Sequence, residues 1–127
     1  MRLELHVLPG RFAACRLPSA DPVPAWVPEA GSLVAVARSP DELSIICDDG
    51  AVPTGVRAER GFRALVVRGP LPFDAVGILA GISSPLAAAG IPLLAISTFD
   101  TDYVLVREER LVDATQALRA EGHVVSW

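Results

Sequence analysis

The stretch VGILAGISSPLAAAGIPLLAISTFDTDYVLV, residues 76–106, contains one helical pattern followed by two strand-like runs. Its first part spaces apolar side chains three and four residues apart, at Leu79, Ile82, Leu86 and Ala89. This spacing predicts an amphipathic helix that ends at Gly90. The runs 91–99 and 103–108 are apolar and β-type, so they predict two strands joined by a short polar turn.

The segments on either side extend this pattern. FRALVVRG (62–69) predicts a strand before the helix, and HVVSW (123–127) predicts a strand at the end. A second helix is expected between Glu109 and Gly122, with one apolar face formed by Leu111, Ala114 and Leu118. Residues 62–127 therefore predict the order β-α-β-β-α-β, in which two helices cover one face of an antiparallel sheet.

Two residues bear on the first helix. Asp74 precedes the apolar pattern and is a residue type that caps helix starts, so we expect it to cap this one. Pro85 falls within the helix, where it removes a backbone donor, and predicts a kink or a tight first turn.

The N-terminal half predicts strands with little helix. LELHVL (3–8) and FAACRL (12–17) flank a Pro-Gly turn and suggest a hairpin. The runs 32–39 and 42–49 flank Pro40-Asp41 and suggest a second pair of strands. Three prolines within 21–31 leave room for at most one helical turn.

The fold class expected from these patterns is α+β. The segment 51–61 mixes proline, glycine and charge without periodicity, which favours an internal boundary there. We therefore expect a strand-rich N-terminal unit at 1–60 and a complete α+β unit at 61–127. The first unit has too little helix to fold alone and is expected to complete the core of the second.

Composition excludes several classes of partner. The net charge is -4 and the arginines are scattered, so the basic patch of a nucleic-acid-binding protein is missing. No apolar run reaches the roughly 18 to 20 residues needed to span a bilayer. The start of the chain lacks the basic and apolar pattern of a secretion signal, and we expect a soluble, cytoplasmic protein.

Catalytic, cofactor and metal sites are not indicated. His6 and His123 fall in strand-like segments, and no G-x-S-x-G nucleophile motif occurs. Cys15 and Cys47 lack metal-binding or redox spacing and are expected to be buried, reduced thiols. The D-T-D sequence that ends at Asp102 supplies too few oxygens for a hard cation. The sequence therefore predicts a protein without enzymatic activity, cofactor or metal.

One binding hypothesis remains from the residues alone. The start of the first helix near Gly77 presents free backbone N–H groups and a positive dipole end, which attract a carboxylate. Asp102 offers the opposite charge to an ammonium group. Together they would suit a zwitterionic amino acid. The alternative is that these residues form only a helix cap and a turn.

Several stretches of the chain resemble the ACT domain superfamily of amino-acid-sensing regulatory modules. They are LPGRFAACRLP (8–18), RSPDELSIICDD (38–49), VGILAGISSPLAAAGIPLLAISTFDTDYVLV (76–106) and the helix that follows. The nearest resemblance is to the branch of the cytosolic arginine sensors and their small bacterial relatives. It implies two ACT-like units with the ferredoxin-like βαββαβ fold, the N-terminal one degenerate.

The resemblance also implies a site. The ligand would lie between two ACT units, with its α-carboxylate on the backbone amides at the first helix start. The positions of this sequence that match are Gly77, Ile78, Thr98, Phe99 and Asp102. Ala75 stands near the place of the family's acidic contact just before the glycine, with Asp74 adjacent.

The arginine sensors carry four such units, whereas this sequence has room for two, so the resemblance implies a homodimer. The expected function is a non-catalytic amino-acid-binding regulatory protein. The alternative is a structural or protein-interaction module whose ligand site has decayed.

Overall fold

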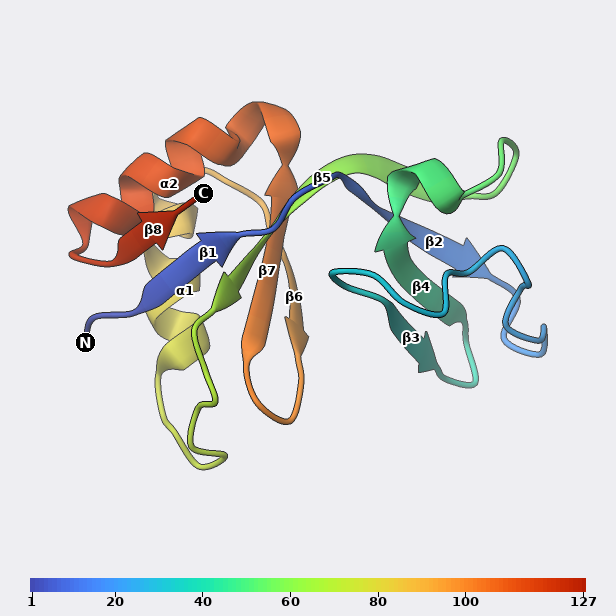
Figure 1. The fold of residues 1–127 in the computed structure, drawn as a ribbon, viewed down its shortest axis with the longest axis horizontal. Helices are drawn as coiled ribbons and strands as arrows, with labels where there is room; N and C mark the ends of the chain where they lie inside the picture. Colours follow the sequence, from blue (N-terminus) through green and yellow to red (C-terminus); the bar gives the residue numbers. More distant parts are fainter. The chain divides into compact units, whose positions relative to one another are not determined.

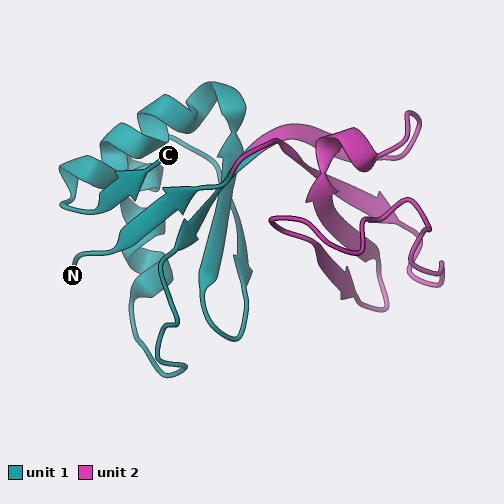
Figure 2. Cartoon of the chain, in the orientation of Figure 1, with its two compact units in different colours: residues 1–8, 63–127 teal, residues 9–62 magenta.

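The computed structural model describes residues 1–127, which form two compact units (Figure 2). Unit 1 combines residues 1–8 with 63–127, and unit 2 is the continuous segment 9–62. The sequence suggested a single division near residue 60, whereas here the first strand groups with the C-terminal part. Each unit has its own cluster of buried apolar side chains, so the N-terminal half does more than complete the other core.

Unit 1 holds a mixed sheet and two helices. In chain order its elements are β1 (Glu4–Val7), the end of β5 (Ala58–Val67), α1 (Ile78–Ala88), β6 (Leu94–Ser97), β7 (Asp102–Arg107), the short 3-10 helix η2 (Glu108–Arg110), α2 (Leu111–Ala120) and β8 (Val124–Ser126). The strands lie in the order β8-β1-β5-β7-β6, and both helices cover one face (Figure 1). The α+β class and the β-α-β-β-α-β order from β5 to β8 are confirmed.

Strand β1 is an addition to this order. It pairs antiparallel with β5 and parallel with β8, and so lies between the first and last strands of the βαββαβ series. The predicted hairpin between 3–8 and 12–17 is therefore wrong. Leu5 and Val7 are buried in the core of unit 1, and that burial decides the partner strands.

Both helices pack on the sheet through apolar faces, but the face predicted for α1 is only partly correct, because Leu79 is half-buried and Ala89 is exposed. Ile82 and Leu86 of α1 are fully buried against the sheet. Helix α2 is buried against the sheet through Leu111, Ala114 and Leu118, which confirms the predicted apolar face of this helix. Neither helix of unit 1, nor any other in the chain, is long and apolar enough to span a bilayer.

Helix α1 begins later than Asp74 and has a different cap. Its N-cap is Gly77, which adopts a left-handed conformation with φ of 86° and makes no side-chain cap bond. The capping role predicted for Asp74 is therefore wrong. Glycine adopts this left-handed conformation readily because it has no Cβ. The helix therefore starts at the residue after Gly77.

Pro85 lies inside α1, and the helix continues through it. Proline cannot donate to the carbonyl four residues earlier, which is that of Gly81. In its place the Nε2 of His123 bonds the Gly81 carbonyl at 2.9 Å. The Nδ1 of the same ring accepts the backbone N–H of Leu3 at 3.0 Å, so the two partners fix the neutral tautomer with the proton on Nε2.

Unit 2 is a small sheet with one 3-10 turn. Its elements are β2 (Phe12–Leu17), β3 (Ala35–Arg38), β4 (Leu43–Asp48), η1 (Asp49–Ala51) and the start of β5, with strand order β3-β4-β2-β5. The antiparallel pairing of β3 with β4 confirms the second predicted strand pair. Asp49 fastens η1 to β5, because its carboxylate accepts from the Arg60 guanidinium and from the Gly61 N–H, each at 2.8 Å.

Both cysteines are buried, unpaired thiols in the core of unit 2, as predicted. Burial raises the pKa of the Cys47 thiol to about 11, with a smaller contribution from the neighbouring Cys15. Burial also raises the pKa of the Cys15 thiol. Thiolate chemistry is therefore disfavoured at both positions near neutral pH.

His123 is expected to stabilise the fold specifically because Pro85 is present. Substitution His123→Phe keeps a ring but leaves the Leu3 N–H and the Gly81 carbonyl without partners, at a cost of about 1–3 kcal/mol per buried group. Pro85→Ala restores an N–H that can bond Gly81, so the histidine substitution should cost less in that background. Urea unfolding of both single variants and the double variant measures this coupling. Strictly additive losses would contradict the proposed link between His123 and Pro85.

The raised pKa of Cys47 predicts a loss of stability in alkali. In the unfolded chain the pKa of a thiol is about 8.5, whereas in the folded protein the pKa of Cys47 is about 11. Between these values the unfolded state binds fewer protons, so the free energy of unfolding falls as the pH rises. Urea unfolding of wild type and Cys47→Ala across this range should show a shallower decline in the variant. If the free energy of unfolding fell equally steeply with pH in both proteins, the loss of stability would not come from Cys47.

Candidate functional site

A cavity of about 680 Å³ lies at the start of α1 in unit 1. Three segments of the chain form it: the connection before the helix, the first turn of the helix, and the turn between β6 and β7. We call it the helix-start cavity. Its lining residues are Leu71, Pro72, Phe73, Ala75, Gly77, Ile78, Leu79, Ala80, Ser97, Thr98, Phe99, Asp100, Thr101 and Asp102.

The helix start gives the cavity a wall that attracts anions. The first N–H groups of α1, from Ile78 onward, have no carbonyl one turn earlier within the helix to bond. The helix dipole adds partial positive charge at the same end. The space beside Gly77 is open, because a Cβ built at that position would meet no atom within 4 Å.

Asp102 also lines the cavity, where it opens β7. It pairs across the hairpin with Ser97 of β6, and the Ser97 hydroxyl donates to Asp102 Oδ1 at 2.5 Å. This bond orients the half-buried carboxylate and leaves Oδ2 available to a cation in the cavity. Ser97 is therefore the residue that positions the carboxylate.

The turn between the two strands is closed by Thr98 and Thr101. The Thr98 N–H donates to the Thr101 carbonyl at 2.8 Å, and its hydroxyl donates to the same carbonyl at 3.1 Å. The Thr98 oxygen also accepts the Thr101 N–H at 3.2 Å. The Thr98 hydroxyl thus maintains the turn, as its residue type would favour.

Aromatic rings border the cavity. Phe73 and Phe99 are in contact, with centroids 5.3 Å apart and planes inclined by 40°. Both rings are about four-fifths exposed, and Val76 beside the helix start is 90% exposed. Large apolar side chains exposed together in this way commonly mark a surface that binds a ligand or a partner.

The charged side chains among the lining residues are Asp100 and Asp102, and no Lys, Arg or His is among them. The cavity therefore combines two carboxylates with the positive end of a helix. This arrangement suits a small molecule that carries both charges.

A family model described as the ACT domain matches residues 57–120, from β5 to the end of α2. The chain belongs to the ACT domain family. A separate family model for an N-terminal domain matches residues 10–55, which make up most of unit 2. The resemblance seen in the sequence is confirmed.

Three relatives show how far the similarity extends. A crystal structure of an Agrobacterium tumefaciens protein is 36% identical with a TM-score of 0.92, over 98% of this chain and 92% of that one. The human cytosolic arginine sensor for mTORC1, subunit 1, is 47% identical over 55 residues, which are 42% of this chain and only 17% of that protein. The ligand-free regulatory subunit of aspartate kinase from Thermus thermophilus shares the fold, with a TM-score of 0.60 at 12% identity, over 87% of this chain and 91% of that one.

All five residues that the ACT resemblance singled out line the helix-start cavity of this ACT domain. They are Gly77, Ile78, Thr98, Phe99 and Asp102. Ala75 also lines it, whereas Asp74 is not among the lining residues. The structure therefore brings the predicted set together around one cavity.

Among the lining residues outside the predicted set, Ser97 and Phe73 make contacts that shape the ACT domain cavity. Ser97 could have been found from the hairpin register. With residues 98–101 as the turn, Ser97 pairs with Asp102 across the two strands. Phe73 had no comparable signal, because its contact with Phe99 joins segments separated by the whole of α1.

Proposed function

We propose that this ACT domain protein is a non-catalytic regulatory protein that binds a free amino acid in the helix-start cavity. The observation that carries the proposal is the pairing of an anion-attracting helix start with Asp102 around one cavity. The cavity lies within the range of about 300–1,000 Å³ that small-molecule sites usually occupy. The names of the human arginine sensor and of the aspartate kinase regulatory subunit favour the same class of role.

The chemistry of an α-amino acid fits the two walls. Its carboxylate accepts from the free N–H groups of Ile78 and the next residues, where the helix dipole favours negative charge. Its ammonium donates to Asp102 Oδ2, while Ser97 holds Oδ1. Its side chain then extends toward Phe73 and Phe99, whose rings offer apolar contact.

We place the amino acid at an interface between ACT units, with a homodimer as the assembly. Phe73 and Phe99 are exposed at the border of the cavity, Val76 is exposed next to Gly77 in the chain, and a second copy would cover them together with the ligand. Ligand binding then favours the assembled conformation over the alternative by linkage. A cytoplasmic location is part of the proposal, in line with the name of the human relative, and nucleic acids and membranes are not among the proposed partners.

A second candidate is a protein-interaction module whose ligand site has decayed. The same exposed Phe73, Val76 and Phe99 favour it, because an apolar patch can serve a protein partner without any small ligand. A persistent dimer that responds to none of the twenty amino acids would favour this candidate.

Thermal unfolding in the presence of each of the twenty amino acids tests the ligand. An amino acid at 100 times its dissociation constant should stabilise the protein by about 2.7 kcal/mol, which raises the melting temperature measurably. Asp102→Ala should abolish the shift, whereas Asp113→Ala, on the exposed side of α2, should retain it. A shift that persists undiminished in Asp102→Ala would place the ligand elsewhere.

Sedimentation analysis at micromolar concentration tests the assembly. We expect a dimeric mass for the wild type and a shift toward monomer for the double variant Phe73→Ser, Phe99→Ser, because both exposed rings lose their apolar surface. Val112→Ser, an equally apolar but separate exposed position on α2, is the control. A monomeric wild type would count against the homodimer.

A further inference from the structure

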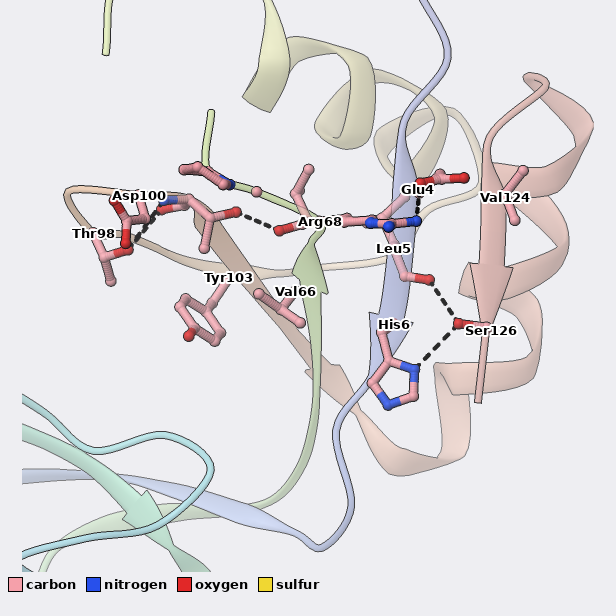
Figure 3. Close-up of a pocket in the computed structure, with 14 residues that line it drawn as sticks. Glu4, Leu5, His6, Val66, Arg68, Thr98, Asp100, Tyr103, Val124 and Ser126 are labelled. Atoms are coloured by element: carbon pink, nitrogen blue, oxygen red, sulfur yellow. Dashed lines mark hydrogen bonds and ion pairs between the residues drawn. The ribbon is translucent and has the colours of Figure 1, made fainter. Parts of the chain in front are cut away.

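A second hollow lies on the helix-free face of the unit 1 sheet (Figure 3). Its volume is about 660 Å³, and we call it the sheet-face depression. Leu5, Val67 and Val125 face the helices, so their strand neighbours His6, Val66 and Ser126 point to the opposite side and line the depression. The Ser126 hydroxyl lies 3.1 Å from His6 Nδ1, which joins β8 to β1 across it.

The two cavities share one wall. Thr98, Asp100 and Thr101 line both the helix-start cavity and the sheet-face depression. The connection from β5 to α1 is divided between them, since Gly69 and Pro70 line the depression and the segment 71–73 lines the helix-start cavity. Segments 69–73 and 98–101 together form a partition between the two cavities.

Hydrogen bonds lock the two segments of the partition together. The Leu71 N–H donates to the Asp100 carbonyl at 2.7 Å, and the Thr101 hydroxyl donates to the Val67 carbonyl at 2.5 Å. A Cβ at Gly69 would lie only 2.9 Å from the Asp100 oxygen, so the two backbones are in close contact. A movement of the turn that keeps these bonds also moves the connection and the end of β5.

We propose that this partition couples the two cavities, so that filling the helix-start cavity changes the conformation of residues that line the sheet-face depression. The helix-free face then reports the state of the ligand cavity. The proposal rests on the proposed function, since it gives the amino-acid site an output. Its physical basis is that Asp102, which Ser97 orients, directly follows Thr101 in the chain, and the Thr101 hydroxyl bonds the Val67 carbonyl.

The test fills the helix-start cavity covalently and requires no amino acid. Ala75→Cys is modified with benzyl methanethiosulfonate, and the backbone amides of Val66 and His6 are followed by NMR. The native cysteines are buried and are expected to remain unmodified. Val112→Cys, modified in the same way on the exposed side of α2, is the control.

The amides of Val66 and His6 should shift when position 75 is modified and should not shift when position 112 is modified. Thr101→Ser keeps the hydroxyl bond to Val67 and should retain the response, whereas Thr101→Val should reduce it by at least half. Gly69→Ala, which wedges the partition apart, provides a second variant with the same expected reduction. Unmoved amides in the parent, or an undiminished response in the folded Thr101→Val or Gly69→Ala variant, would overturn the coupling.

An absent response here with a positive thermal shift for an amino acid would remove the coupling and leave the proposed function intact. An NMR response without a thermal shift for any amino acid would support the coupling through the partition. It would also exclude an amino acid as the natural ligand of the helix-start cavity. The two proposals therefore fail separately.

Discussion

One imidazole ring fastens α1 to the rest of unit 1, in addition to the buried apolar face of the helix. A helix with an internal proline has a carbonyl without its usual donor, and such a group is costly when it is buried. His123 supplies the missing donor to Gly81 and accepts from Leu3 on its other nitrogen. The ring thereby ties α1 to the N-terminal segment and to the start of β8. Because the first turn of α1 forms one wall of the helix-start cavity, the geometry of the candidate site follows from this contact.

The β6–β7 turn shows how one short polar segment can serve structure and binding together. Its hydroxyls are mostly engaged within the chain, where Ser97 orients Asp102 and Thr98 closes the turn. The interpretation as a turn and the interpretation as a binding wall are therefore compatible. What remains for a ligand is a carboxylate oxygen held in place by its neighbours, which is the kind of preorganisation that reduces the entropy lost on binding.

Local patterns predicted the helices and most of the strands because the alternation of buried and exposed positions can be seen within a short segment of sequence. Leu111, Ala114 and Leu118 were placed correctly for this reason. The patterns failed where the partner was distant. The strand at 3–8 looked like half of a hairpin, yet its partners are β5 and β8, and Asp74 looked like a cap although Gly77 has that position. The ACT resemblance, rather than periodicity, drew Thr98 and Phe99 into the predicted set, and no pattern pointed to Phe73.

The arrangement of β1 has a consequence for synthesis on the ribosome. The strand emerges before unit 2, but one of its neighbours is β8, and the Leu3–His123 contact spans 120 residues. Unit 2 is continuous and has its own core, so nothing in its connectivity requires it to wait for the last strand. Its sequence would leave the exit tunnel while β1 is still unpaired. The inserted segment is thus in a position to fold first, and the surrounding domain closes only when the final residues arrive.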